Sequence, residues 1–309
     1  MSQNGVRFNS QTTSGAVLID INSIPADKPV LIAGATASGK SALALEIASK
    51  QGGVIVNADA LQVFDGWRIL TARPTDADLA RADHRLYGHV GFDQGYSVGK
   101  WLRQVGKILQ DRPDRPIIVG GTGLYFRALT EGLAEIPPTP PELRAQSEQR
   151  LTDQGLAALL DELDAVTLAR IDCKNPVRVQ RAWEVLQTTG RSLAAWQDAT
   201  PPPVLPLDCC TALLINAERD WLNARINKRF DLMLKAGALE EARQMEPRWQ
   251  PGYLSSKAIG ATELIGHIRG EISLAQARTA ACIASHQYAK RQRTWFRARM
   301  KGWKPLNPA

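Results

Sequence analysis

Eight consecutive residues, Gly-Ala-Thr-Ala-Ser-Gly-Lys-Ser at positions 34–41, constrain the fold of this chain more than any other feature. They match G-x-x-x-x-G-K-[ST] in full, and they stand between an apolar run at 29–34 and a helical pattern at 41–50. A phosphate-binding loop (P-loop) needs this context, because the helix N-terminus and the backbone N–H groups must face the anion. The motif predicts a polyphosphate or pyrophosphate site and does not specify ATP.

Further apolar runs extend this strand-to-helix unit into a sheet. The predicted strands are 54–59, 116–120 and 212–217, and the predicted helices are 98–110, 219–235 and 274–301. Short apolar runs that alternate with helices are typical of buried parallel strands joined by right-handed crossovers. The sequence therefore predicts an α/β fold, with a doubly wound parallel sheet of the P-loop NTPase-like kind.

Two proline-rich runs, at 136–141 and 201–203, interrupt the alternation of strands and helices. Between them, residues 142–163 and 176–187 have helical periodicity with many charges and no strand-like run. We therefore expect a small all-helical insertion domain at 133–203.

The rest of the chain divides into a core and a leader. The core that carries the P-loop is predicted at 29–132 and 204–309, and residues 1–28 are expected to be a disordered or loosely attached leader. No stretch approaches the roughly 18–20 apolar residues of a membrane helix, and the leader lacks a basic n-region followed by an apolar h-region. We expect a cytoplasmic protein with no membrane partner. Nothing in the sequence indicates obligate assembly, so a monomer is expected.

The positive charge of the chain is concentrated at its C-terminal end. Lysine and arginine number 38 against 31 acidic residues, a net charge of +7. No acidic residue follows Glu271, and the segment 272–309 holds eight basic residues with Trp295, Phe296 and Trp303 among them. Basic residues interleaved with aromatic rings suit RNA or single strands, through phosphate contacts and base stacking. A solvated amphipathic helix is the alternative interpretation.

Polar residues follow the second and third predicted strands at their carboxyl ends. Asp59 closes the second strand, and Gly120-Gly121-Thr122-Gly123 follows the third. Open α/β sheets place their ligand crevice at this edge, so both segments should face the P-loop. A carboxylate there can be a magnesium ligand, a general base or a helix cap, and the glycine run can be a tight turn.

Five sequence blocks occur in a specific order and spacing. They are 34–41 (GATASGKS), 59–64 (DALQVF), 71–75 (TARPT), 120–129 (GGTGLYFRAL) and 287–296 (QYAKRQRTWF). Together they resemble the tRNA dimethylallyltransferase family of the bacterial type, also called tRNA isopentenyltransferases. The resemblance implies transfer of a five-carbon prenyl group from dimethylallyl diphosphate to N6 of the adenosine 3′-adjacent to the anticodon. It also implies the anticodon stem-loop of tRNA as partner and Mg²⁺ as cofactor.

The resemblance gives roles to residues of the predicted core. The implied diphosphate contacts are Gly34, Thr36, Ala37, Ser38, Gly39, Lys40 and Ser41, with Ser41 also a metal ligand. Asp59 would accept the proton of the attacking amine, Thr122 would lie near the reacting centre, and Arg225 would stabilise the leaving diphosphate. The implied contacts with the target nucleotide are Asp59, Ala60, Leu61, Gln62 and Thr122.

Other matching positions imply contacts with the rest of the tRNA. They are Arg144, Val177, Arg178, Val179, Gln180 and Arg181 in the insertion, and Lys290 and Arg291 in the basic tail. The alternative for the arginines is a solvated helix face. The chain departs from the family pattern at Ala60, Phe64 and Ala261, where hydroxyl-bearing residues are usual.

Three other functions are consistent with parts of this pattern. A kinase of nucleosides or small metabolites would use the same P-loop for ATP, but it needs no basic aromatic tail. A prenyltransferase acting on free adenine nucleotides would share the P-loop and Asp59 and could dispense with the arginines of the insertion. A catalytically silent RNA-binding protein is favoured only by the departures at Ala60, Phe64 and Ala261.

Overall fold

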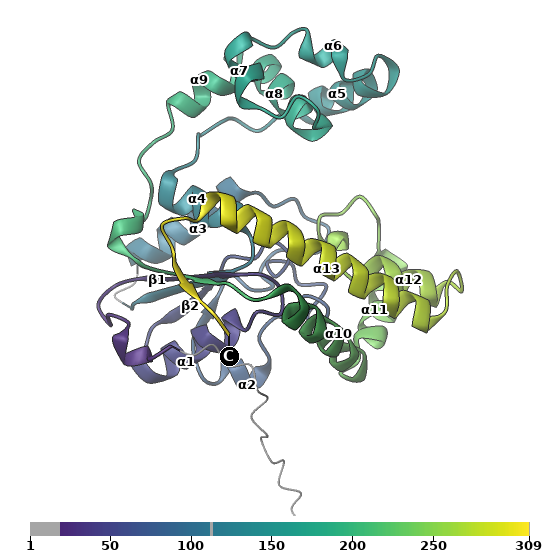
Figure 1. Cartoon of the computed structure of the whole chain (residues 1–309). Coiled ribbons are helices and arrows are strands. Elements are labelled where there is room, and N and C mark those ends of the chain that lie inside the picture. The colour runs from purple at the N-terminus through teal and green to yellow at the C-terminus, as the bar shows by residue number, and fades with distance from the viewer. Residues whose placement is uncertain (1–18, 112–113, 309) are drawn as a thin grey trace, which may run out of the picture. The chain divides into compact units, whose positions relative to one another are not determined.

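Six strands form one all-parallel sheet, in the order β3-β2-β4-β1-β5-β6 (Figure 1). The structure is a computed structural model and describes residues 19–111 and 114–308. The strands are β1 (Val30–Gly34), β2 (Val54–Asn57), β3 (His84–Arg85), β4 (Pro116–Gly120), β5 (Thr211–Ile215) and β6 (Lys304–Leu306). The four predicted strands are the four central ones, and the predicted α/β class is confirmed.

The two edge strands were not predicted from the sequence. β3 has two residues, and β6 contains Pro305 between a lysine and a leucine. Neither forms the continuous apolar run that marks a buried strand, and proline is tolerated at a sheet edge because one side of an edge strand needs no donor. Both strands are therefore specified by their partners β2 and β5 rather than by their own sequence.

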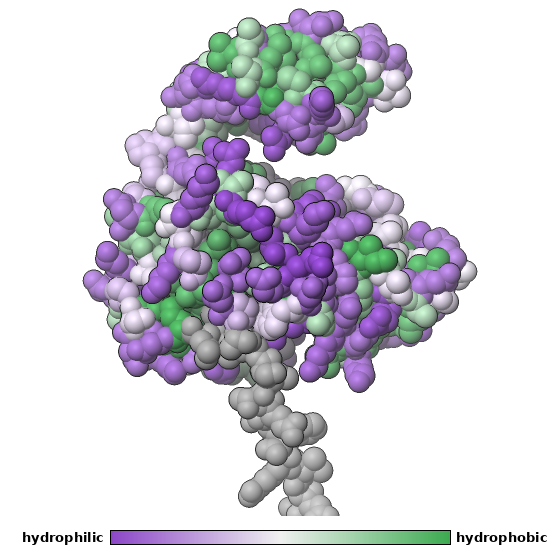
Figure 2. Space-filling view, viewed as in Figure 1, coloured by the Kyte–Doolittle hydropathy of each residue, from purple (hydrophilic) through white to green (hydrophobic). Residues whose placement is uncertain are grey.

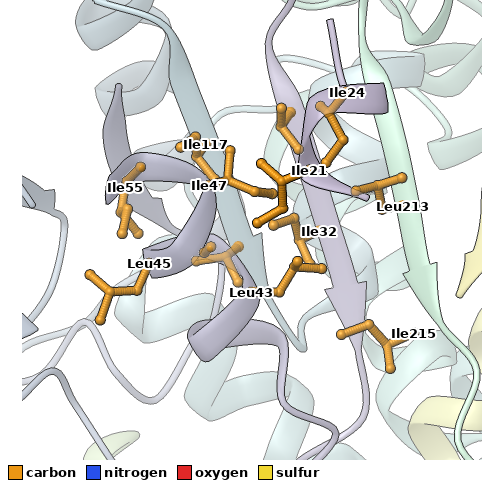
Figure 3. Packing of buried hydrophobic residues seen from close by; sticks show 14 of the residues in the cluster. Ile21, Ile24, Ile32, Leu43, Leu45, Ile47, Ile55, Ile117, Leu213 and Ile215 are labelled. Atoms are coloured by element: carbon orange, nitrogen blue, oxygen red, sulfur yellow. The ribbon is translucent and has the colours of Figure 1, made fainter. Parts of the chain in front are cut away.

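Helices cover both faces of the sheet (Figure 1). On one face lies α1 (Lys40–Gln51), whose Leu43 and Ile47 pack over Ile32 of β1 and Ile117 of β4 (Figure 3). Burial of a side chain of this size stabilises the fold by about 1.5–3 kcal/mol. On the other face lies α3 (Val98–Asp111), where the buried indole of Trp101 donates a hydrogen bond of 2.7 Å to the carbonyl of Asn57. This arrangement is the doubly wound sheet that the sequence predicts.

Part of the expected leader belongs to this core. The short helix η1 (Ile21–Ser23) places Ile21 and Ile24 against α1 and the sheet, and each side chain is only 3% exposed (Figure 3). The side-chain amide of Gln51 donates hydrogen bonds to the carbonyls of both isoleucines. The prediction of a loosely attached segment is therefore wrong for residues 19–28, and residues 1–18 lie outside the described residues.

A second compact unit, Arg127–Pro206, contains only helices among its described elements. The helices are α5 (Pro141–Asp153), α6 (Ala157–Leu160), α7 (Ala165–Arg170), α8 (Pro176–Thr189) and α9 (Leu193–Asp198), and the end of α4 (Gly123–Glu131) also belongs to it. The helix expected at 142–163 ends instead at Asp153, because Gly155 adopts a φ of 77° and turns the chain. The unit has its own core around Leu159, Val179 and Trp183.

Four helices near the C-terminus pack together in the first unit, which comprises Met1–Phe126 and Leu207–Ala309. They are α10 (Arg219–Lys235), α11 (Ala238–Met245), α12 (Ala261–Ile268) and α13 (Leu274–Arg299). Short segments connect the main elements: α2 (Asp76–Leu79), η2 (Leu207–Cys209), η3 (Glu246–Arg248) and η4 (Ser255–Lys257). Within the described ranges, no helix combines the length and apolar character needed to cross a membrane.

Gly120 lies at the carboxyl end of β4, where the backbone packs closely against the segment that follows β2. A Cβ at this position would lie 2.0 Å from the carbonyl oxygen of Ala58, which accepts a hydrogen bond from the N–H of Thr122. We expect Gly120→Ala to lower the free energy of unfolding by about 3 kcal/mol or more, because two backbone segments would have to separate. Gly252→Ala, with no atom within 4 Å of its Cβ, is the control and should change stability little. Urea denaturation of both variants measures the difference, and equal midpoints would contradict this account.

Candidate active site

The P-loop joins the carboxyl end of β1 to the N-terminus of α1. Ala37 and Gly39 adopt φ values of 62° and 94°, which turn the backbone around an open centre. The helix starts at Lys40, so the positive end of its dipole faces the same centre. Ser38 is fully buried, and its hydroxyl has no hydrogen-bond partner among the described residues. A loop with this turn and this helix terminus is suited to binding an anion.

Gln292 of α13 fixes the P-loop to the glycine-rich turn after β4. Its side-chain oxygen accepts a hydrogen bond from the N–H of Thr36 at 2.9 Å, and its side-chain nitrogen donates to the carbonyl of Gly121 at 2.9 Å. The side chain is 6% exposed, so both hydrogen bonds are shielded from water. The side chain of Gln292 thereby fixes the loops that follow β1 and β4 relative to each other.

Asp59 follows β2 and lies at the same edge of the sheet. Its N–H donates to the side chain of Asn57 at 2.9 Å, and one of its carboxylate oxygens accepts from the N–H of Leu61 at 3.0 Å. The hydroxyl of Thr122 accepts a hydrogen bond of 2.9 Å from the N–H of Ala60. These contacts fix the carboxylate group in a turn and leave its second oxygen available to a ligand.

A pocket opens between these loops and α10. Its polar lining includes Lys40, Ser41, Asp59, Gln62 and Arg229, and its apolar lining includes Leu70, Ile226, Phe230, Met233 and Ile259. A pocket with this division can hold a molecule that has a charged end and a hydrocarbon end. The side-chain amide of Gln62 donates to the carbonyls of Thr71 and Ala72, so its orientation is fixed at the pocket wall.

The charged groups of the pocket favour an anion. Burial lowers the pKa of Lys40 to about 8, the nearby Asp59 opposes this effect, and Arg229 adds to it. Burial also lowers the pKa of Arg229, again with Asp59 acting in the opposite direction. Two cations therefore share one carboxylate in a partly desolvated site. A bound polyphosphate would relieve the excess of positive charge.

Arg225 lies beside the P-loop rather than in the lining of the pocket. Its Nε donates a hydrogen bond of 3.0 Å to the carbonyl of Ala37, and its guanidinium group stacks on the ring of Trp221 at 4.6 Å. The structure thus brings Arg225 to the loop, and its predicted role at the leaving diphosphate stays a prediction. The structure also adds Arg229, one helical turn further along α10, which the sequence analysis did not identify.

The donor set at this edge suits a magnesium ion. The hydroxyl of Ser41 and the carboxylate of Asp59 both line the pocket, and Mg²⁺ is usually held by one or two protein oxygens together with phosphates and waters. Within the described ranges, no group of three or more histidine, cysteine, aspartate or glutamate residues could hold a metal by itself. The residues present therefore fit a metal that arrives with a phosphate ligand.

The helical unit holds most of the residues that are predicted to contact tRNA, and their side chains differ in exposure. Val177 and Arg178 are exposed on α8, whereas Val179 is wholly buried in the core of the unit. The helical period turns the Val179 side chain inward with Trp183, so the predicted tRNA contact of this residue stays a prediction that its side chain does not support. Its neighbours Gln180 and Arg181 are partly exposed, and the predicted contact Arg144 on α5 is exposed.

The C-terminal half of α13 is strongly hydrophilic on the face seen in Figure 2. Lys290 and Arg291 are exposed there, while Ala289 and Gln292 are buried. Tyr288 lines the pocket, and burial raises the pKa of its hydroxyl, with the nearby Asp59 adding to the effect. The same helix thus presents cations to solvent and a neutral hydroxyl and an amide to the site.

Sequence reasoning did not assign most of the apolar lining of the pocket, nor several of its polar residues. Arg229, Tyr288 and Gln292 reach the site from α10 and α13, far from the P-loop in the sequence. One signal was available for Arg229, which lies four residues after Arg225 and so shares its helix face. The contacts of Gln292 had no local signal.

Comparison with known proteins places the chain among prenyl-transferring enzymes of tRNA. The model of the family "IPP transferase" matches residues 62–299, and that of "Isopentenyl transferase" matches residues 28–94. A tRNA dimethylallyltransferase of Cereibacter sphaeroides is 61% identical over 93% of this chain and 91% of its own length. One of Ruegeria sp. is 60% identical over 94% of this chain and 99% of its own length.

Solved structures agree with this comparison. The full-length tRNA isopentenylpyrophosphate transferase of Bacillus halodurans superposes with a TM-score of 0.65 at 28% identity, over 91% of this chain and 90% of that one. A eukaryotic dimethylallyltransferase acting on tRNA gives a TM-score of 0.75 at 23% identity, over 91% of this chain and 74% of that one. The second likeness concerns the fold alone.

The lowered pKa of Lys40 predicts proton uptake when an anion binds. At pH 8.6 a lysine with a pKa of about 8 is roughly 80% neutral, and a bound diphosphate should restore its charge. We expect inorganic pyrophosphate to bind with uptake of about 0.8 proton by Lys40 at pH 8.6 and almost none at pH 6.5. Titration calorimetry in buffers of different ionisation enthalpy measures this uptake.

Two variants isolate the contribution of the lysine from the protonation of pyrophosphate itself. Lys40→Met should bind more weakly and lose this uptake, whereas Lys228→Met, which replaces an exposed lysine of α10, should behave as the wild type. Equal proton uptake in all three proteins would show that Lys40 is not the titrating group.

Proposed function

The chain belongs to the IPP transferase family, and on that premise we propose that it transfers a dimethylallyl group from dimethylallyl diphosphate to N6 of the adenosine 3′-adjacent to the anticodon in tRNA. One observation carries the proposal beyond family membership. The pocket joins a cationic phosphate-binding loop to an apolar wall, and Asp59 lines the same pocket. A diphosphate ester with a short hydrocarbon chain has the same two ends.

The reaction follows from the order of these groups. The N6 amine attacks the first carbon of the prenyl chain, an N–C bond forms, and the bond from that carbon to the diphosphate oxygen breaks. Asp59 accepts the proton that the amine loses. Negative charge grows on the departing diphosphate, and Lys40 and Arg229, which line the pocket, together with the P-loop amides, stabilise it.

Other residues act by positioning the reacting groups. Arg225 orders the P-loop through the Ala37 carbonyl, and Thr122 orders the turn of Asp59 through the N–H of Ala60. Gln62 would contact the target base, and its side-chain amide is held by the carbonyls of residues 71 and 72. Ser41 is the residue that would hold Mg²⁺, which would neutralise part of the diphosphate charge.

We also propose which surfaces hold the RNA. The helical insertion would contact tRNA through Arg144, Val177, Arg178 and Arg181, and α13 through Lys290 and Arg291. The cationic groups of these arginines and of Lys290 can bind phosphates of the anticodon stem-loop. The adenosine would leave its stack and enter the pocket, as enzymes that modify a base require. The protein is proposed to act as a monomer.

Incubation with radiolabelled dimethylallyl diphosphate tests this function directly. Parallel reactions contain unmodified tRNA, the same tRNA with the target adenosine replaced by guanosine, AMP or ATP. Label transferred only to the first tRNA supports the proposal. Label on AMP or ATP would identify a nucleotide prenyltransferase. Phosphoryl transfer from ATP would identify a kinase. Binding of tRNA without transfer of label would identify a catalytically silent RNA-binding protein.

The role of Asp59 can be tested with an isosteric variant. Asp59→Asn keeps an oxygen that can accept from the N–H of Leu61, but it removes the base, so we expect transfer to slow by about 10²–10⁴ with tRNA affinity retained. Asp65→Asn, which removes an exposed carboxylate nearby in the sequence, is the control. Single-turnover rates measure the effect, and an Asp59→Asn variant with more than half of the wild-type rate would exclude Asp59 as the base.

The cationic surface predicts a salt-dependent RNA affinity. Replacing Arg178, Lys290 or Arg291 by alanine should weaken tRNA binding and reduce the slope of log K against log salt by somewhat under one unit for each lost phosphate contact. Affinity for dimethylallyl diphosphate should not change. Lys50→Ala, at the far end of α1 from the P-loop, is the control for loss of one charge. Filter binding at several salt concentrations decides, and unchanged slopes would indicate a solvated helix face.

A further inference from the structure

The helical unit contains a buried carboxylate that the proposed chemistry does not use. Glu184 of α8 is only 4% exposed, although an isolated buried charge is costly. One of its oxygens accepts a hydrogen bond of 3.0 Å from the hydroxyl of Ser147 on α5, and the other accepts one of 3.3 Å from the hydroxyl of Thr139. Burial of this carboxylate costs free energy of folding, and a role of Glu184 in binding would account for that cost.

Two arginines lie near this carboxylate, at N–O distances that are long for an ion pair. The Nε of Arg144 is 3.9 Å from one oxygen of Glu184, and an Nη of Arg181 is 4.0 Å from the other. The side chains of Arg144 and Arg181 are 59% and 41% exposed. Both guanidinium groups are therefore attracted toward Glu184, yet each remains accessible to solvent.

Hydroxyl groups connect the carboxylate to its polar neighbours. An Nη of Arg181 donates to the hydroxyl of Thr139 at 2.7 Å, and that hydroxyl donates to Glu184. The amide of Gln180 donates to the hydroxyl of Ser147 at 2.8 Å, and this hydroxyl also donates to Glu184. Three residues predicted to contact tRNA, one on α5 and two on α8, thus converge on a single buried carboxylate.

We propose that Glu184 is a positioning residue for RNA binding, which holds Arg144 and Arg181 in the orientation that receives RNA phosphates. The inference rests on the proposed function, because it requires that these arginines contact the RNA. Long arginine side chains lose considerable conformational entropy when they bind a phosphate. Because Glu184 restrains the two arginine side chains in the free protein, part of this entropy is lost before the RNA binds. The distances of about 4 Å between their nitrogens and the Glu184 oxygens leave the guanidinium groups able to pair with phosphates.

Glu184→Gln tests the proposal, since it keeps the shape of the side chain and removes its charge. We expect the KM for tRNA to rise roughly tenfold, the scale of one lost charge-assisted phosphate contact, with kcat at saturating tRNA and the KM for dimethylallyl diphosphate unchanged. Glu148→Gln removes the same charge from an exposed position on α5 and should leave all three values unchanged.

A double-mutant cycle distinguishes positioning from a merely structural role. If Glu184 acts through the arginines, Glu184→Gln should have no further effect on tRNA affinity in a protein that already carries Arg144→Ala and Arg181→Ala. An equal effect in both backgrounds would overturn the proposal, and so would tighter tRNA binding by Glu184→Gln, which would show that the carboxylate competes with phosphates. Absence of transfer by the wild type would instead refute the proposed function.

Discussion

The two hydrogen bonds of Gln292 are the contacts on which the geometry of the active site depends. P-loop residue Thr36 and Gly121 follow different strands, and a shared edge of the sheet brings them close without fixing their loops. The amide of Gln292 satisfies one group from each loop and is itself buried. Because Lys290 and Arg291 precede it on α13, the helix that is proposed to touch RNA is the one that holds the phosphate-binding loop in place. A shift of this helix would act on both sites together.

The charges of the pocket depend on this arrangement. Burial is the main cause that lowers the pKa of Lys40 and of Arg229, Asp59 opposes it, and a neighbouring arginine adds to it in each case. A site of this kind carries an excess of positive charge that a bound anion would neutralise. Glu184 gives a related case in the helical unit, where one buried carboxylate lies about 4 Å from two arginines. In the first site the excess charge is left for a diphosphate, and in the second the arginines are restrained but still available.

The sequence predicted those features whose signal is local. The P-loop, the four central strands and Asp59 each lie in a segment whose residue types and spacing suffice. Gln292 could not be found in this way, because its contact with Thr36 spans 256 residues. The burial of Val179 was predictable in principle, since its spacing from Ala182 and Trp183 places it on the inner face of α8. The same spacing of Ile21 and Ile24 marked an apolar face in the segment expected to be a leader.

The P-loop leaves open which bond of the substrate breaks, and we propose that the apolar lining of the pocket decides this. In phosphoryl transfer the acceptor must reach the terminal phosphorus, so polar groups must surround that phosphate. Here Ile226, Phe230 and Met233 of α10 present an apolar surface to the pocket, and Arg229 projects from the same helix. A diphosphate held by the loop and by Arg229 can extend a hydrocarbon chain along this wall, where its first carbon becomes the electrophile. In the proposed function, the alternation of apolar and cationic residues on one helix thus makes an anion-binding loop suitable for alkyl transfer.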